Sequence, residues 1–219
     1  MRIVLVEDHL MFREILRIFC AKELKADVVG EAGSGQEAMR IIRKVQPDCV
    51  LLDLHLPEGD GFEVAEFTLS RWPSTKVLML SSHCDDYTLL RVEQSGAHGF
   101  VDNGSQTLND LRRAFAALAR DEKFYSPAYD EAKRARASDL HFSQILSKQE
   151  CVVLSLIGQS FSDQEIARQL GITPTTAQTH RSHIMRKLDV SGTAKLIQFA
   201  LEHGFTRVVT QRNGKSVLP

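Results

Sequence analysis

The stretch CVLLDLHLPEGDG, residues 49–61, decides how the first half of the chain is interpreted. Its first five residues form a short apolar run that ends on a carboxylate, Asp53. Such a run, followed by turn residues, is typical of a strand that is buried on both faces. On either side the pattern repeats, with helical spacing of apolar residues between the runs. The sequence therefore predicts five strands, at residues 3–6, 28–31, 49–53, 76–80 and 99–101.

Strands that alternate with helices predict a doubly wound, five-stranded parallel sheet of the flavodoxin type, with helices on both faces. Ligands of such sheets bind in the crevice beyond the carboxyl ends of the strands. Several polar side chains follow those ends: Glu7, Asp8, Asp53, Ser81, Ser82, Asp102 and Asn103. Carboxylates that share a crevice raise one another's pKa, and a hard cation such as Mg²⁺ removes that conflict. A carboxylate beside Mg²⁺ can act as a nucleophile toward a phosphoryl group.

Residues 1–120 resemble the receiver domain of response regulators. The motifs that carry the resemblance are VEDH at 6–9, LLDLHLPEGDG at 51–61, LMLSS at 78–82 and GAHGF at 96–100. The resemblance implies that Asp53 is the phosphoacceptor, and that a partner histidine kinase supplies the phosphate. It also implies a Mg²⁺ site and a switch pair. The metal ligands would be Glu7, Asp8, Asp53 and the backbone carbonyl of His55, and the switch residues would be Ser81 and Phe100.

Asn103 departs from this family pattern, which has a Lys at that position. An amide donates hydrogen bonds but brings no charge to a phosphoryl group. Two hypotheses stay open: a receiver switched by phosphorylation, or a phosphorylation-independent module for dimerisation or ligand sensing. An aspartyl phosphatase is disfavoured, because the first strand is followed by Glu7-Asp8-His9 rather than Asp-x-Asp. We therefore do not expect an enzyme.

Beyond residue 120 the pattern changes to helices alone. Residues 121–143 lack a strong period and are interpreted as a linker. Ser147 with Glu150, and Ser162 with Glu165, have the spacing of capping boxes at two helix starts. Thr173-Pro174 opens a third helix after a turn at Gly171, and a fourth follows from about residue 192. A short helix, a glycine turn and a longer helix form a helix-turn-helix, here within an all-helical domain at 144–207, followed by a tail at 208–219.

The third helix of this domain has one apolar and one polar face. Ala177, Ile184 and Leu188 are spaced to pack inward. The polar face suits the major groove, where Gln178 and Ser182 would read base edges and basic residues would neutralise phosphates. The complete set of predicted DNA contacts is Thr175, Thr176, Gln178, Thr179, Arg181, Ser182, Arg186 and Lys187.

Residues 146–205 resemble the four-helix domain of the LuxR/NarL-type regulators. The motifs are LSKQE at 146–150, SDQEIA at 162–167, LGITPTTA at 170–177 and IMRKL at 184–188. Together with the receiver, they place the chain closest to the NarL/FixJ subfamily. The resemblance implies a double-stranded DNA operator and a homodimer. Gln178 and Arg181 stand where the family more often has Lys and an aliphatic residue.

Charge and hydropathy agree with a regulatory module followed by a nucleic-acid module. Residues 1–120 hold 14 basic and 18 acidic side chains, whereas residues 121–219 hold 13 and 10. A mildly basic second half suits a polyanionic partner. No stretch approaches the roughly 20 apolar residues of a membrane span, and the first residues do not resemble a signal peptide. The sequence therefore predicts a cytosolic protein.

Overall fold

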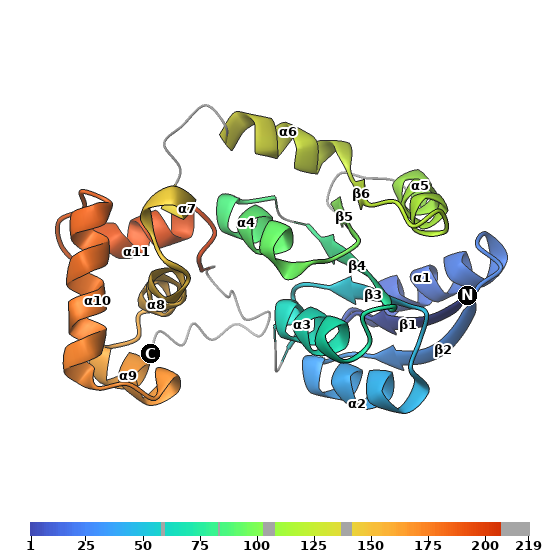
Figure 1. The fold of residues 1–219 in the computed structure, drawn as a ribbon, viewed down its shortest axis with the longest axis horizontal. Coiled ribbons are helices and arrows are strands. Elements are labelled where there is room, and N and C mark those ends of the chain that lie inside the picture. Colours follow the sequence, from blue (N-terminus) through green and yellow to red (C-terminus); the bar gives the residue numbers. More distant parts are fainter. Residues whose placement is uncertain (58–59, 83, 103–107, 137–141, 207–219) are drawn as a thin grey trace. The chain divides into compact units, whose positions relative to one another are not determined.

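The computed structural model describes residues 1–57, 60–82, 84–102, 108–136 and 142–206 (Figure 1). The chain divides into two compact units. One comprises Met1–Cys84 and Leu89–Arg134, and the other comprises Asp85–Thr88 and Ala135–Pro219. Within the described ranges, every helix is too short or too polar to cross a membrane.

The first unit is built on one parallel sheet with the strand order β2-β1-β3-β4-β5-β6. Its strands are β1 (Arg2–Val6), β2 (Asp27–Ala32), β3 (Cys49–Asp53), β4 (Lys76–Ser81), β5 (Gly99–Asp102) and β6 (Phe124–Tyr125). The first five coincide with the five apolar runs, so the parallel α/β sheet expected from the sequence is confirmed. The number of strands differs, because the sheet has six.

The sixth strand lies in the segment that the sequence presents as a linker. Gly99 of β5 pairs with Phe124, and the Ser126 N–H donates to the Phe100 carbonyl at 3.0 Å. β6 is only two residues long, so it carries no alternation that a sequence pattern could reveal. The unit accordingly continues past residue 120, through β6 and most of helix α6 (Pro127–Arg136), as far as Arg134.

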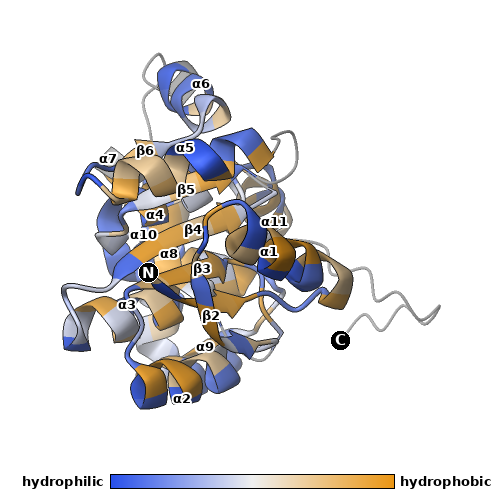
Figure 2. Ribbon diagram, turned by 90° about the vertical axis from the view of Figure 1, so that its right-hand side faces the viewer, coloured by the Kyte–Doolittle hydropathy of each residue, from blue (hydrophilic) through white to orange (hydrophobic). Residues whose placement is uncertain are grey.

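Helices cover both faces of this sheet, as the apolar runs require. One face packs against α2 (Gly35–Val45), α3 (Gly61–Arg71), α4 (Asp86–Ser95) and α6. The other packs against α1 (Leu10–Lys22) and α5 (Leu108–Leu118). Figure 2 shows the strands in the hydrophobic colour and helices such as α2 with one hydrophobic and one hydrophilic side. This layering leaves the strand ends as the place where polar side chains gather.

The second unit is helical, in agreement with the sequence. Its helices are α7 (Phe142–Ile145), α8 (Lys148–Gly158), α9 (Asp163–Leu170), α10 (Pro174–Lys187) and α11 (Thr193–Glu202). Both expected capping boxes are present, at Ser147/Glu150 and at Ser162/Glu165. Gly171 ends α9 with φ +64°, a left-handed conformation that glycine adopts without strain. α10 packs against both α9 and α8, with Ala177 and Ile184 fully buried.

Candidate metal centre and nucleic-acid interface

The three acids expected at the strand ends do come together. Glu7 and Asp8 follow β1, and Asp53 ends the neighbouring strand β3. One carboxylate oxygen from each lies within 4.8 Å of those of the other two. Glu7 and Asp53 are buried, whereas Asp8 is exposed. The arrangement is a small acidic cradle that opens to solvent on the side of Asp8.

Backbone contacts fix the position of Asp53 in this cradle. The His55 N–H donates to Asp53 Oδ1 at 3.0 Å, and the Leu54 N–H donates to the Leu80 carbonyl of β4 at 3.0 Å. A Cβ at Gly61 would lie 2.6 Å from the Asp53 carbonyl oxygen, so only glycine allows α3 to start this close to the strand end. The backbone at Asp53 is thus enclosed by the sheet on one side and by the first turn of α3 on the other, and the His55 N–H orients its carboxylate.

Mutual repulsion is visible in the acid–base behaviour of Glu7. Its pKa is raised to about 7, first because burial penalises the charged form and then because Asp53 and Asp8 add negative charge. The His9 N–H, which donates to Glu7 Oε1 at 3.0 Å, and the cationic Arg13 oppose this rise. The other oxygen, Oε2, is buried without a hydrogen-bond partner in the described part of the chain. An orphaned carboxylate oxygen beside two further carboxylates fits a hard cation such as Mg²⁺.

Mg²⁺ affinity is therefore expected to depend on pH. Ligation requires the charged form of Glu7, so the Mg²⁺ affinity should rise roughly tenfold per pH unit below about pH 7 and level off above it. Calorimetric titration with MgCl₂ across this range measures the slope. Glu7→Gln removes the titrating group and should flatten the profile. An unchanged slope in Glu7→Gln would assign the proton to another group.

The expected switch residues lie on the two strands beyond β3. Ser81 ends β4 and is fully buried, next to Asp102 in the register of β4 and β5. Phe100 on β5 is also fully buried, and its ring lies 5.5 Å from that of Tyr129 on α6. Asn103 lies outside the described residues. Tyr129 could not be identified from the sequence, because it is an isolated aromatic residue in a segment without a helical or strand period.

Most of the expected DNA contacts share an open face of α10. Seven of the eight are exposed: Thr175, Thr176, Gln178, Thr179, Ser182, Arg186 and Lys187. The Thr179 hydroxyl donates to the Thr175 carbonyl, and the Ser182 hydroxyl donates to the Gln178 carbonyl. These bonds use the hydroxyl hydrogens and leave oxygen lone pairs to accept from base or sugar donors.

Arg181 is placed differently from the expectation. Its side chain is only 12% exposed, and its Nε donates to Asp163 Oδ1 at 2.8 Å. Nη2 reaches the same carboxylate and the Phe161 carbonyl. Arg181 therefore contacts the start of α9 instead of standing on the open face of α10.

Lys187 also has a partner inside the unit. Its Nζ lies 2.7 Å from Oε2 of Glu150, a buried residue of the α8 capping box. Burial is the largest influence on the pKa of Glu150 and raises it. The hydrogen bonds from Lys187 and Ser147 outweigh that influence and lower the pKa to about 2. The sequence motif revealed the cap, but a partner 37 residues away leaves no trace in local spacing.

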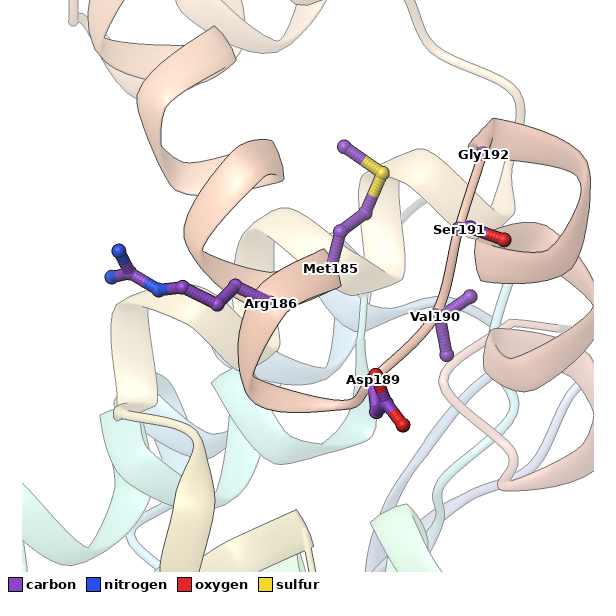
Figure 3. Close-up of a pocket in the computed structure, with 6 residues that line it drawn as sticks. All are labelled: Met185, Arg186, Asp189, Val190, Ser191 and Gly192. Atoms are coloured by element: carbon purple, nitrogen blue, oxygen red, sulfur yellow. The ribbon is translucent and has the colours of Figure 1, made fainter.

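The end of α10 borders an open cavity of about 490 Å³. Figure 3 shows its six lining residues, which come from the last turn of α10 and the connection to α11. The Arg186 side chain extends away from the other five, into solvent. Of the three cations expected to neutralise phosphates, Arg186 and Lys187 are exposed, and Lys187 is the one of these two that pairs with an acid, Glu150.

Comparison with known families agrees with both halves of this description. Residues 3–116 match the response regulator receiver domain, and residues 144–200 match the bacterial regulatory proteins of the luxR family. The chain is 29% identical to an uncharacterized transcriptional regulatory protein, YhcZ, of Bacillus subtilis, over 96% of this chain and 100% of that protein. It is 30% identical to the response regulator VraR of Staphylococcus aureus, over 92% of this chain and 97% of VraR.

Solved structures share the fold. One is RcsB of Salmonella enterica serovar Typhimurium, bound to a promoter in the presence of the phosphomimetic BeF₃⁻. The match covers 91% of this chain and 97% of the RcsB chain, with a TM-score of 0.65 and 23% sequence identity. Another is a LuxR-family two-component response regulator of an Aurantimonas species. The match covers 63% of this chain and 98% of the Aurantimonas chain, with a TM-score of 0.59 and 28% sequence identity.

Proposed function

This chain belongs to the LuxR/NarL family of DNA-binding response regulators, and from that premise we propose that phosphorylation of Asp53 by a partner histidine kinase controls its binding to operator DNA. The observation that carries the proposal is the cradle of Glu7, Asp8 and Asp53 at the strand ends. An oxygen of Asp53 attacks phosphorus, a new O–P bond forms, and the bond to the donor breaks with its electron pair leaving on the donor.

The residues in and around the cradle have different roles in this phosphoryl transfer. Bound to the carboxylates of Glu7, Asp8 and Asp53 and to the His55 carbonyl, Mg²⁺ would offset the negative charge that gathers around the phosphoryl group. Ser81, buried at the end of the next strand, contacts the phosphoryl group in the active form. Phe100 lies one strand further and packs on Tyr129 of α6, so a shift of the switch residues reaches the segment that precedes the DNA-binding unit.

The direct test is Mg²⁺-dependent incorporation of phosphate from acetyl phosphate, located by mass spectrometry of the intact protein and its peptides. Wild type should gain one phosphoryl group on Asp53, and Asp53→Asn should gain none. Asp48→Asn is the matched control, because Asp48 is exposed at the opposite end of the same strand. Incorporation into Asp53→Asn at the wild-type rate would place the acceptor elsewhere.

Asn103 decides between this function and its alternative. A phosphoryl group adds roughly two negative charges to the acidic cradle, and Asn103 supplies no cation there. If phosphorylated and unmodified proteins bind DNA equally, and Asn103→Lys does not change this, the receiver acts independently of phosphorylation. Wild-type binding that tightens with phosphodonor treatment supports control through Asp53.

For DNA, we propose that Gln178 and Ser182 read bases while Arg186 attracts phosphates. The probe is a duplex that the wild-type protein selects from a randomised library, compared with a scrambled duplex of equal composition. Gln178→Ala should cost roughly 1–3 kcal/mol on the selected duplex and little on the scrambled one, measured by fluorescence anisotropy. Gln198→Ala, an exposed glutamine on α11, is the control. Equal losses on both duplexes would contradict base reading by Gln178.

A single recognition helix reads only a few base pairs, so we further propose that the protein acts in the cytoplasm as a homodimer on two half-sites about one helical turn apart. A solved complex of the structural relative RcsB contains two RcsB dimers bound to two parallel DNAs. The selected duplexes should therefore contain paired motifs. A selection that returns one unpaired motif at full affinity argues for monomeric binding.

A further inference from the structure

Arg181 and Asp163 join the two helices of the helix-turn-helix at a second point. The C-terminal end of α9 is connected to α10 through the turn at Gly171–Thr173. The N-terminal end of α9 is connected to α10 by the ion pair, with both Nε and Nη2 of Arg181 at 2.8 Å from Asp163 Oδ1. A helix held at both ends cannot change its angle to α10 without breaking one of these connections.

The surroundings of Arg181 argue against contact with DNA phosphates. Its side chain is 12% exposed, and its guanidinium also donates to the Phe161 carbonyl at 3.4 Å. Arg186, five residues further along α10, is exposed and extends into solvent (Figure 3). Turning Arg181 toward a phosphate would leave the Asp163 carboxylate, 29% exposed, without its cation.

We infer that Arg181 is a positioning residue, which acts through Asp163 to set the orientation of α10 and with it the discrimination between DNA sequences. Because a positioning residue releases no counterions from DNA, its loss should change affinity but leave the salt dependence intact. A change at Asp163 distinguishes positioning of α10 from simple attraction of DNA phosphates. If only overall charge matters, removing an acid from a DNA-binding unit strengthens DNA binding. If the pair positions α10, the same change weakens binding.

The experiment uses the full chain, the selected and scrambled duplexes, and a series of salt concentrations. Arg181→Ala and Asp163→Ala should each weaken binding to the selected duplex about tenfold, with little change on the scrambled duplex. The double variant should be no weaker than either single variant, because both remove one shared contact. Arg186→Ala is the control and should weaken binding to both duplexes and lower the salt slope by about one unit.

Two further variants separate positioning from loss of folding. Arg181→Lys keeps a cation in reach of Asp163 and should recover part of the discrimination, as should the reversed pair, Arg181→Asp with Asp163→Arg. Hydrogen exchange in α9 and α10 reports whether each variant is folded. The inference is overturned if the salt slope of Arg181→Ala falls by about one unit, or if Asp163→Ala binds DNA more tightly than wild type. It is also overturned if both single variants discriminate between the two duplexes as well as wild type does.

Discussion

Replacing Tyr129 by alanine is expected to destabilise the receiver unit by about 3–5 kcal/mol, the usual cost of removing a large buried aromatic side chain. Tyr129 is only 2% exposed. Its ring stacks on Tyr125 of β6 at 4.6 Å and lies 5.5 Å from that of Phe100 on β5. The side chain therefore holds α6 against the sheet, and its loss leaves a cavity beside the predicted switch residue.

Because the chain has a single tryptophan, the loss of stability in the receiver unit can be measured separately from the DNA-binding unit. Trp72 follows α3 and contacts Phe67, so its fluorescence reports unfolding of the receiver. The urea midpoint seen by Trp72 should fall strongly in Tyr129→Ala, and hydrogen exchange in α6 should accelerate. Tyr129→Phe keeps the ring and its contacts with Tyr125 and Phe100, and should therefore cost much less than Tyr129→Ala. An unchanged midpoint in Tyr129→Ala would mean that α6 adds nothing to the unit.

Glu150→Gln is expected to destabilise the DNA-binding unit by about 3 kcal/mol at neutral pH, the order of magnitude for removing one partner of a buried ion pair. The Glu150 carboxylate is buried, bonded to Lys187 at 2.7 Å and part of the α8 capping box. Its folded-state pKa of about 2 lies below the ordinary value of 4.5. A depressed carboxyl pKa contributes stability that is fully present above about pH 4.5 and is lost as pH falls toward 2. The difference between wild type and Glu150→Gln should therefore shrink across that window.

Hydrogen exchange of α8 and α10 as a function of pH measures this effect within the helical unit. Glu165→Gln is a matched control, because Glu165 completes the same capping box on α9 but is half-exposed and pairs with no lysine among the described residues. Its effect should be smaller. If the two variants cost the same, the cap alone accounts for the stability and the Lys187 pair adds nothing. Lys187→Ala should reproduce most of the Glu150→Gln loss.

Several features of both units could be predicted from the sequence because they depend on near neighbours. The runs at residues 3–6 and 49–53 are long enough to show a buried strand, and parallel strands bring their carboxyl ends to one edge. Glu7, Asp8 and Asp53 therefore meet as expected. The capping boxes at Ser147 and Ser162 are also local, since cap and partner are three residues apart.

Other features depend on contacts between distant parts of the chain, and sequence spacing does not record them. β6 forms because β5 offers an unpaired edge, so two residues suffice where a longer isolated strand would be needed. The sequence presents Arg181, Arg186 and Lys187 alike, as cations that could neutralise phosphates, and gives no hint of their partners within the unit. The structure pairs Arg181 with Asp163 and Lys187 with Glu150, across helices.

The sequence by itself determined the first five strands, which acids share an edge, and which side of α10 is polar, because each follows from a local period. Only the tertiary structure decided which cations on α10 pair with acids of the neighbouring helices. A charged side chain near a packing surface takes the nearest opposite charge, and that partner is set by how α8, α9 and α10 pack. For the same reason, Arg181 pairs with Asp163 of α9 and Lys187 with Glu150 of α8, while Arg186 extends into solvent (Figure 3).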